Sequence, residues 1–457
     1  MKTLWRNLAL ILIPLTLVGA GCGGSSEAQT LATKPATLTI WRVFDNDKTF
    51  QELMSSYQAL HPNVSFEYRE LRIDEYEDEL LHAFARGEGP DIFSIHNTWI
   101  GEYESLIAPL PKSLSIPYSE TRGTIKKETV YTIKEEPTIS QRALKTDFVD
   151  VVAQDVIRQY KPNAQAEAEN QIFGLPLSVD TLALYYNKDL LNAAGIAQPP
   201  ETWTQFQDAV TKLTKITTND EILQSGAAMG TSRNVERAVD IVSLLMMQNG
   251  ARIVDERGRA DFAQETDAGL LAGEAVRFYT DFGSPQKAVY TWNAQQPDSF
   301  DAFVNGSTGF FLGYSYHGAF IRTINSKLNF AVAPVPQIEG GKTVNFANYW
   351  VETVAKSSTA PDWAWDFIQF AASKDQVTKY LTVANKPTAL RGLINTQIED
   401  EVLSIFVGQS LTAQSWYKGK DAQVAEEAFL DLIDAFLSGE EQESALVNAQ
   451  NKVNQTL

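Results

Sequence analysis

In the first part of the chain, segments in which hydrophobic residues recur with the spacing of a strand alternate with segments in which they recur with the spacing of a helix. The five segments are strand 36–43, helix 47–60, strand 64–68, helix 76–84 and strand 91–95. Pro62 disfavours helix in the residue before it, and Gly87 is well placed to end the second helix. Strands that alternate with helices at this spacing predict an α/β lobe with a mainly parallel sheet.

Helical spacing dominates the second part of the chain. We expect strands through 175–179 and 182–186. The expected helices are 203–213, 235–248, 269–282, 361–372, 422–437 and 441–454. Between these parts, residues 111–146 carry charge, Thr and Ser with only a short alternation at 129–133, and we interpret them as an insertion without an assignable role.

The first 36 residues have the composition of an export segment. Lys2 and Arg6 precede an apolar run at 8–18, which is shorter than the roughly 20 residues that cross a bilayer. Small residues then lead to Cys22, the only cysteine of the chain, which cannot form an internal disulfide. The stretch resembles a bacterial lipoprotein signal with Cys22 as the lipidated residue, although Gly19 stands where that pattern favours leucine. An ordinary signal peptide is the alternative.

These features predict a signal peptide over 1–21 and a Gly/Ser-rich flexible tether over 22–36. The remaining length exceeds what one hydrophobic core usually supports, so we expect two lobes. The chain has 38 basic and 57 acidic residues, a net charge of −19, which argues against nucleic acid or an anionic membrane surface as a partner.

A series of short sequences along the chain carries a family resemblance. In chain order they are His61-Pro62-Asn63-Val64, Gly89-Pro90-Asp91-Ile92, Gly174-Leu175-Pro176, Leu184-Tyr185-Tyr186-Asn187-Lys188-Asp189-Leu190, Pro200-Glu201-Thr202-Trp203, Phe303-Val304-Asn305-Gly306, Pro334-Val335-Pro336 and Trp363-Ala364-Trp365-Asp366. Their order and spacing resemble extracellular solute-binding proteins of the maltose-binding type, the family 1 group that serves ABC importers.

The resemblance implies a two-lobed α/β fold of the type II periplasmic-binding-protein class. It has mainly parallel sheets flanked by helices, and a ligand cleft lies between the lobes. By analogy, the first lobe takes 37–179 and 351–396, and the second takes 180–350 and 397–457. The implied protein is a monomer outside the cytoplasm, lipid-anchored to the cell membrane. It captures a small solute by lobe closure and delivers it to permease subunits.

Sugar binding requires aromatic faces for the ring and polar side chains for the hydroxyls. Candidates lie in loops after strands and at the expected crossings between lobes, where the family places its contacts. They are Trp41, Asp45, Asn97, Trp99, Asp180, Arg233, Tyr314, Tyr316, Trp350 and Trp416. A mono- or oligosaccharide is therefore the expected ligand. The same fold could instead bind a polyamine, peptide or sugar phosphate, or act as a receptor or adhesin without a transporter.

The residues do not favour catalysis, a metal or a cofactor. His61, His82, His96 and His317 lack the spacing of zinc ligands on one helix turn. Carboxylate pairs are abundant in any acidic chain, so they do not point to a glycosidase. We therefore expect a binding protein without cofactor or metal, and not an enzyme.

Overall fold

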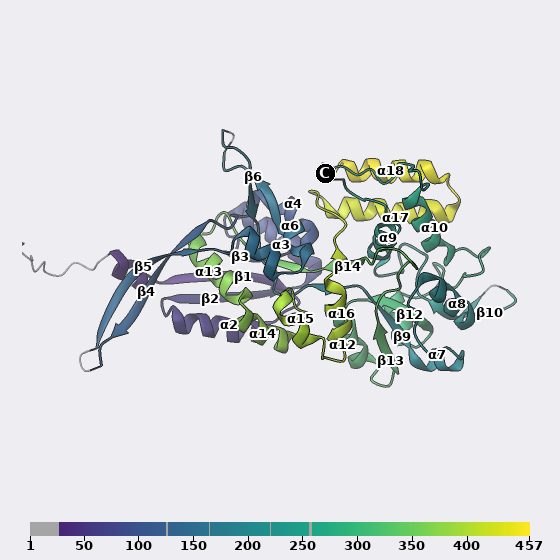
Figure 1. Ribbon diagram of the computed structural model, residues 1–457, viewed down its shortest axis with the longest axis horizontal. Helices are drawn as coiled ribbons and strands as arrows, with labels where there is room; N and C mark the ends of the chain where they lie inside the picture. The colour runs from purple at the N-terminus through teal and green to yellow at the C-terminus, as the bar shows by residue number, and fades with distance from the viewer. Residues whose placement is uncertain (1–26, 125–126, 164, 220, 256–257) are drawn as a thin grey trace, which may run out of the picture.

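The computed structural model describes residues 27–124, 127–163, 165–219, 221–255 and 258–457. The described chain forms two lobes that lie side by side (Figure 1). Each lobe has its own β-sheet and its own cluster of buried apolar residues. The proposed signal and Cys22 lie outside the described residues.

The first lobe is built on a four-stranded sheet of order β15-β3-β1-β2. Its strands are β1 (Ala36–Val43), β2 (Val64–Leu71), β3 (Ile92–His96) and β15 (Trp350–Val354). The pairs β1–β2 and β1–β3 are parallel, whereas β15 enters from far along the chain and pairs antiparallel with β3. The helices of this lobe are α2 (Asp47–Leu60), α3 (Ile73–Arg86), α5 (Gln141–Asp147), α6 (Asp150–Val156), α13 (Pro361–Ala372), α14 (Lys374–Ala384) and α15 (Arg391–Gln397), with the short α4 (Ile100–Tyr103) and the 3-10 turns η1 (Asn97–Trp99) and η2 (Glu104–Leu106).

Helix α2 illustrates how the sequence pattern fixes this lobe. The side chain of Asn46 caps its first turn by accepting a hydrogen bond from the backbone N–H of Thr49. Phe50, Leu53, Met54 and Tyr57 then fall on one face and are buried in the core of the lobe. The expected helix over 47–60 is thus confirmed.

The second lobe has a five-stranded sheet of order β10-β11-β12-β9-β13. Its strands are β9 (Ala183–Asn187), β10 (Lys215–Ile216), β11 (Ile222–Ala227), β12 (Thr308–Gly313) and β13 (Phe330–Ala333). Its helices are α7 (Lys188–Ala193), α8 (Trp203–Leu213), α9 (Ala238–Gln248), α10 (Leu271–Asp281), α11 (Ser299–Val304), α12 (Ser315–Ile324), α17 (Ala422–Ser438) and α18 (Gln442–Asn454). Strand β9 pairs antiparallel with both β12 and β13, so the sheets are mixed, not mainly parallel as expected.

A small third sheet joins the lobes, in the order β16-β14-β8. It contains β8 (Asp180–Thr181), β14 (Asn345–Asn348) and β16 (Ala413–Gln414), the last of which follows α16 (Leu403–Ser410). Buried side chains of α16 contribute to two clusters, because Val407 packs in the core of the first lobe and Phe406 packs beside Tyr185 of the second. Short strands that carry the chain between two separate cores form a hinge.

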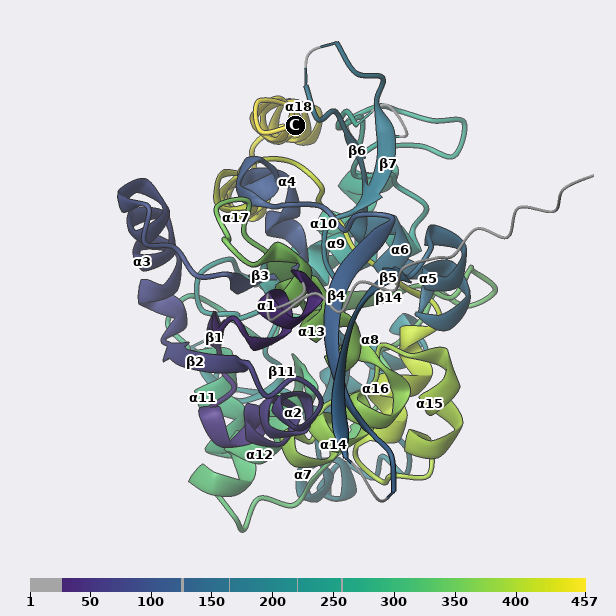
Figure 2. The same ribbon diagram turned by 90° about the vertical axis from the view of Figure 1, so that its left-hand side faces the viewer.

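Residues 111–146, which the sequence left without a role, form a long hairpin and a helix. Strands β4 (Ser113–Arg122) and β5 (Glu128–Pro137) pair antiparallel over their whole length, side by side in Figure 2, and the hairpin projects from the first lobe in Figure 1. The base of this hairpin is anchored because Leu114 and Ile116 of β4 are buried in the core of the first lobe. The helix α1 (Glu27–Thr33) packs against both strands, and a shorter hairpin joins β6 (Ile157–Tyr160) to β7 (Glu169–Ile172).

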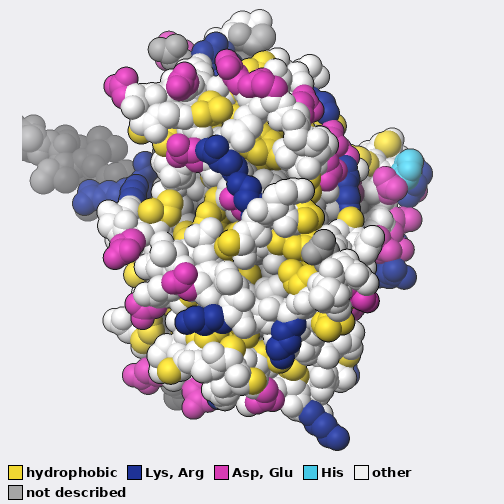
Figure 3. All heavy atoms as spheres, turned by 90° about the vertical axis from the view of Figure 1, so that its right-hand side faces the viewer, with side chains coloured by type: hydrophobic (Ala, Val, Ile, Leu, Met, Phe, Trp, Pro, Cys, Tyr) yellow, Lys and Arg dark blue, Asp and Glu magenta, His cyan; other side chains and the backbone are white. Residues whose placement is uncertain are grey.

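The strand expected over 175–179 is replaced by two isolated bridges, Leu175 to Glu352 and Ser178 to Thr388. Leu175, Leu177 and Val179 are nonetheless buried. The alternating pattern thus predicted correctly which side chains are buried, although the segment does not form a paired strand. The outer face of the second lobe shows acidic and basic side chains interspersed with small apolar patches (Figure 3).

Candidate functional site

Aromatic side chains gather on the side of the first lobe that faces the second. Trp99 lies in the 3-10 turn after β3, and Trp350 opens β15 beside it. Their ring centroids are 5.4 Å apart and nearly perpendicular. His96, at the end of β3, contacts both rings edge-on, at 6.3 Å from Trp99 and 5.9 Å from Trp350. Trp99 packs against the cores of both lobes, which places this cluster at the boundary between them.

Polar and aromatic side chains of α9 and α12 form the opposing surface on the second lobe. Tyr314 and Tyr316 stack with centroids 6.1 Å apart, and the guanidinium of Arg237 lies 5.2 Å from the Tyr314 ring. Arg237 also donates hydrogen bonds to the hydroxyl of Tyr316 and, over 3.2 Å, to Glu236. Tyr314 is buried and donates to Asp240 over 2.7 Å, whereas Tyr316 keeps 37% of its surface exposed. Tyr316 is therefore the ring of this pair that a ligand can reach.

Asp180 lies on β8, where the chain crosses between the lobes. Its Oδ2 accepts hydrogen bonds from the backbone N–H and the hydroxyl of Ser315, over 3.0 and 2.6 Å. Burial raises the pKa of Asp180 to about 6, although these hydrogen bonds act in the opposite direction. Its Oδ1 accepts a third hydrogen bond from the backbone N–H of Thr181, and Asp180 is thus joined to the first turn of α12, next to Tyr316.

Charges on the two lobes act on each other across this boundary. Burial raises the pKa of Glu426 on α17 to about 7, with further contributions from Asp240 and from Glu77 of the first lobe, although Glu426 keeps exposed surface. Burial also lowers the pKa of His96 to about 4, and the positive charge of Arg237 on the other lobe adds to that effect. These electrostatic effects place ionisable groups of the two lobes near one another. We refer to the surface formed by His96, Trp99, Asp180, Arg237, Tyr316, Trp350 and Glu426 as the inter-lobe site.

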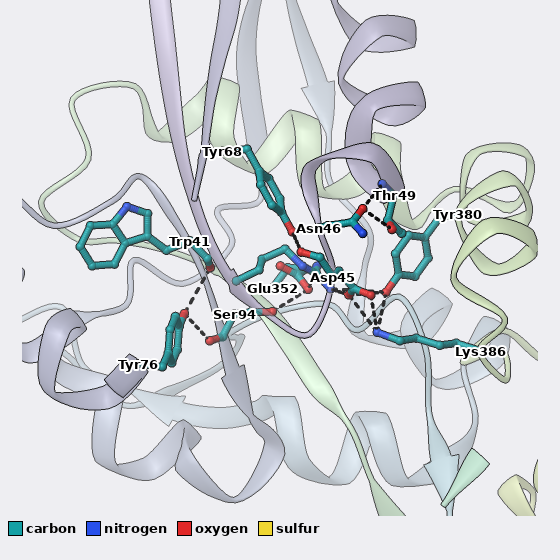
Figure 4. Close-up of polar contacts among 11 residues, drawn as sticks. Trp41, Asp45, Asn46, Thr49, Tyr68, Tyr76, Ser94, Glu352, Tyr380 and Lys386 are labelled. Carbon is teal, nitrogen blue, oxygen red and sulfur yellow. Dashed lines mark hydrogen bonds and ion pairs between the residues drawn. The ribbon is translucent and has the colours of Figure 1, made fainter. Parts of the chain in front are cut away.

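Three predicted site residues contact other side chains of the first lobe. Trp41 is half-buried in β1, with the guanidinium of Arg69 4.6 Å from its ring. Asn97 is buried and donates a hydrogen bond to Asp155 over 3.2 Å. Asp45 is 4% exposed and is enclosed by cations and hydroxyls (Figure 4). Asn97 and Asp45 are therefore buried, whereas Trp41 is half-buried, as Trp99 and Trp350 also are.

Two further predicted residues are not brought into the inter-lobe site. Arg233 is exposed on the second lobe and pairs with Glu427, Asp431 and Asp434 of α17. Trp416 is 4% exposed and packs in the core of that lobe, 4.9 Å from Phe429.

Sequence reasoning missed three members of the site: His96, Arg237 and Glu426. Arg237 lies four residues after the predicted candidate Arg233, directly before α9. His96 had a usable signal, since it ends a core strand directly before Asn97. Glu426 had none, because an acidic residue near the start of a helix is common in this chain.

Two hollows elsewhere on the surface are separate from this site. One of about 620 Å³ lies on the first lobe, lined by Phe148, Lys374 and Arg391 among others. The other, of about 490 Å³, lies around residues 195–212 of the second lobe.

Within the described ranges there is no group of three or more His, Cys, Asp or Glu side chains that could hold a metal ion. None of the helices described is long and apolar enough to cross a membrane.

Known proteins resemble this chain in both sequence and structure. The sequence profile of the bacterial extracellular solute-binding proteins matches residues 123–378. The arabinooligosaccharide-binding protein of Bacillus subtilis is 21% identical over 391 residues, which cover 83% of this chain and 79% of that protein.

Solved structures of sugar-binding proteins share the fold. The sugar-binding protein MalE from Xanthomonas citri matches with a TM-score of 0.68 at 16% identity, covering 92% of this chain and 97% of that one. The ABC transporter solute-binding protein of Thermotoga lettingae, bound with α-D-tagatose, matches with a TM-score of 0.65 at 19% identity, over 92% and 99% of the two chains. The periplasmic-binding-protein fold expected from the sequence is therefore confirmed.

The matched profile covers more than half of the chain, so family membership rests on sequence and not on fold alone. Members of this family bind solutes and are not enzymes. The chain belongs to the bacterial extracellular solute-binding proteins, and it acts as the solute-binding component of an ABC transporter.

Proposed function

We propose that the ligand is a mono- or oligosaccharide held at the inter-lobe site. The observation that carries the proposal is the pairing of Trp99 and Trp350 on one lobe with Asp180, Arg237 and Tyr316 on the other. Aromatic faces stack on the apolar face of a sugar ring, and charged hydrogen-bonding groups orient its hydroxyls. A ligand that contacts Trp99 and Trp350 together with Asp180 and Arg237 touches both lobes, so its binding favours the conformation in which the lobes approach each other.

The lobe division that suits this mechanism assigns residues 37–179 and 350–396 to the first lobe, one residue earlier than the 351 expected from the sequence, because Trp350 pairs with His96 in the first-lobe sheet. The second lobe then takes 180–349 and 397–457. Crossings at β8, between β14 and β15, and near β16 would let the lobes rotate as units around Asp180 and Trp350. The closed form would then dock on membrane permease subunits.

We also propose that the protein works outside the cytoplasm as a monomer, held to the membrane by a lipid on Cys22. The support is the sequence around that residue and the extracellular character of the family. Metabolic labelling with a fatty acid should mark the wild-type protein and not Cys22→Ala, which should be released from the membrane fraction. A wild-type protein that carries no lipid would contradict the anchor without affecting ligand binding.

Relatives support a carbohydrate ligand because of the ligands named with them. One binds arabinooligosaccharides, and one solved structure holds α-D-tagatose. These ligands differ in size, so they support the class of ligand and not its length.

A polyamine is the second candidate ligand, favoured by the charge of the site. Within the inter-lobe site, the carboxyl groups of Asp180 and Glu426 outnumber the cation of Arg237. Aromatic rings together with carboxylates also suit an ammonium group. The raised pKa of Glu426, about 7, weakens this alternative, because a carboxyl group that is partly protonated at neutral pH attracts a cation less.

A thermal-shift screen tests the ligand class. The lipid-free chain is exposed to maltotriose, arabinotriose, mannotriose, tagatose and spermidine. A solute that binds only the folded state stabilises it by about 2.7 kcal/mol at a hundredfold excess over Kd. We expect a shift with at least one saccharide and none with spermidine.

Two tryptophan variants locate the binding. Trp350→Ala should raise the Kd of that saccharide about tenfold or more, because a stacking partner is lost. Trp363→Ala is the matched control, since Trp363 is a half-buried tryptophan of the same lobe that packs on His61. Equal losses in both variants would place binding elsewhere, and a response to spermidine alone would replace the sugar by a cation.

A further inference from the structure

Phe44 occupies a position that its side chain does not favour. It lies between β1 and α2, 59% exposed, with a φ of +67°. The other non-glycine residue with positive φ in the described part of the chain is Asn385, which ends α14 and belongs to a type that tolerates this region. A bulky aromatic residue there carries backbone strain, and its exposure shows that core packing does not compensate for it.

The backbone around Phe44 is a tight turn. The N–H of Asp45 donates to the carbonyl of Val43 over 2.9 Å, closing a three-residue turn with Phe44 at its centre. A hydrogen bond from residue i+2 back to residue i, with positive φ in the middle, is a γ-turn of the rare and strained kind. Such strain persists only where the surrounding structure fixes the backbone, and it is found at ligand-binding sites.

A buried ionic network holds Arg42, which precedes this turn, and Asp45, which ends it. Arg42 donates to Asp45 over 2.6 Å and also to Glu352, and both flanking side chains are buried. Lys386 and the hydroxyl of Tyr380 approach Asp45 to 2.7 and 2.9 Å (Figure 4). Because the residues on either side are held inside the lobe, Phe44 is directed outwards.

The ring of Phe44 extends the aromatic surface of the inter-lobe site. It meets Trp350 edge-on, with centroids 5.8 Å apart and an interplanar angle of 78°. Trp350 in turn contacts Trp99. Phe44, Trp350 and Trp99 therefore form one continuous aromatic wall on the first lobe, of which Phe44 is the most exposed member.

We propose that Phe44 is a ligand-binding residue whose ring forms a stacking platform together with Trp350, and that the buried network of Arg42, Asp45 and Lys386 positions it. The proposal rests on the carbohydrate function proposed above. It gives Asp45, which the sequence predicted as a ligand contact, a positioning role.

Isothermal titration calorimetry with maltotriose, arabinotriose, mannotriose and tagatose tests the proposal on four variants. For each probe that binds the wild type, Phe44→Ala and Phe44→Gly should raise Kd about tenfold, because both remove the ring. Phe44→Tyr keeps an aromatic face and should stay within about twofold of the wild type. Leu60→Ala is the control, since Leu60 is a similarly exposed apolar residue of the same lobe, and it should bind as the wild type does.

Melting temperatures separate a ligand contact from a structural one. Glycine accepts positive φ without strain, so Phe44→Gly should melt no lower than Phe44→Ala although both lose binding. Unchanged Kd in Phe44→Ala, with a wild type that binds sugar, would overturn the role of Phe44 and leave the carbohydrate function intact. A wild type that binds none of the four probes would overturn the ligand class itself, and a large drop in melting temperature in both variants would make Phe44 a packing residue.

Discussion

Buried charged residues make the stability of the first lobe depend on pH, and Asp45 is the clearest example. Burial by itself would raise the pKa of Asp45, but the attraction of Arg42 and Lys386 outweighs it and lowers the pKa from 3.8 to about 2. A carboxyl group with a depressed pKa stabilises the folded state while it is ionised. A single residue of the turn beside Phe44 thus links the stability of the lobe to pH.

We expect this contribution to be complete above about pH 4 and to be lost as the pH falls towards 2. The shift corresponds to about 2 kcal/mol of unfolding free energy. Urea denaturation at several pH values should show the wild type losing this amount between pH 4 and pH 2, on top of the general acid destabilisation. Asp45→Asn should lack that extra loss.

Asp74→Asn provides the control for the acid measurement, because Asp74 is 61% exposed and pairs only with an exposed arginine. Its pH profile should follow that of the wild type. Identical profiles for Asp45→Asn and the wild type would show that the ionic network does not stabilise the lobe.

Among the elements, the hinge owes its geometry to one residue of α6. Asp155 is 3% exposed and accepts hydrogen bonds from Tyr349 over 2.7 Å and from Ser415 over 2.6 Å. It also accepts one from Asn97, which begins the 3-10 turn that contains Trp99. Three segments far apart in the sequence, two of them at the crossings between lobes, therefore meet at one carboxylate.

We expect Asp155→Ala to lower the unfolding free energy by about 3 kcal/mol, because several buried donors lose their acceptor at once. Chemical denaturation measures the loss, and calorimetry on a bound saccharide should show weaker binding because the Asn97–Trp99 turn is released. Asp150→Ala on the same helix is the matched control, since Asp150 is 64% exposed and pairs with Arg391. Equal effects from the two variants would refute a special role for Asp155.

At the scale of the whole molecule, each lobe has its own large apolar core, with a smaller cluster around Tyr185 in the second lobe, and short strands join the two lobes. A ligand can shift the arrangement of the two lobes only by binding one arrangement better than another. Contacts to Trp350 on one side and Arg237 on the other meet this condition.

Small-angle X-ray scattering should therefore report a smaller radius of gyration when the saccharide found in the thermal-shift screen is added. Trp350→Ala at the same sugar concentration should show little compaction, because it retains only the contacts to the second lobe. A wild type that binds the sugar without any change in radius would mean that the lobes are already closed without ligand or that binding does not involve both of them.

The outline of the fold could be read from the sequence because it depends on local signals. Periodicity located β1 and α2, Gly87 ended α3, and Trp203 began α8. Spacing could not show that residues 111–146 form a paired hairpin, since pairing depends on a partner strand, nor that β15 lies antiparallel beside β3.

The sequence by itself determined the alternation of helices and strands, the need for two cores, and the aromatic and acidic residues available for a site. Only the tertiary structure decided which of them face the ligand. It put Arg237 rather than Arg233 between the lobes, buried Trp416 and Tyr314, and turned Phe44 outwards. The physical reason is that exposure and strain arise from contacts between segments such as 42–45 and 352–386, which lie hundreds of residues apart and leave no local periodicity.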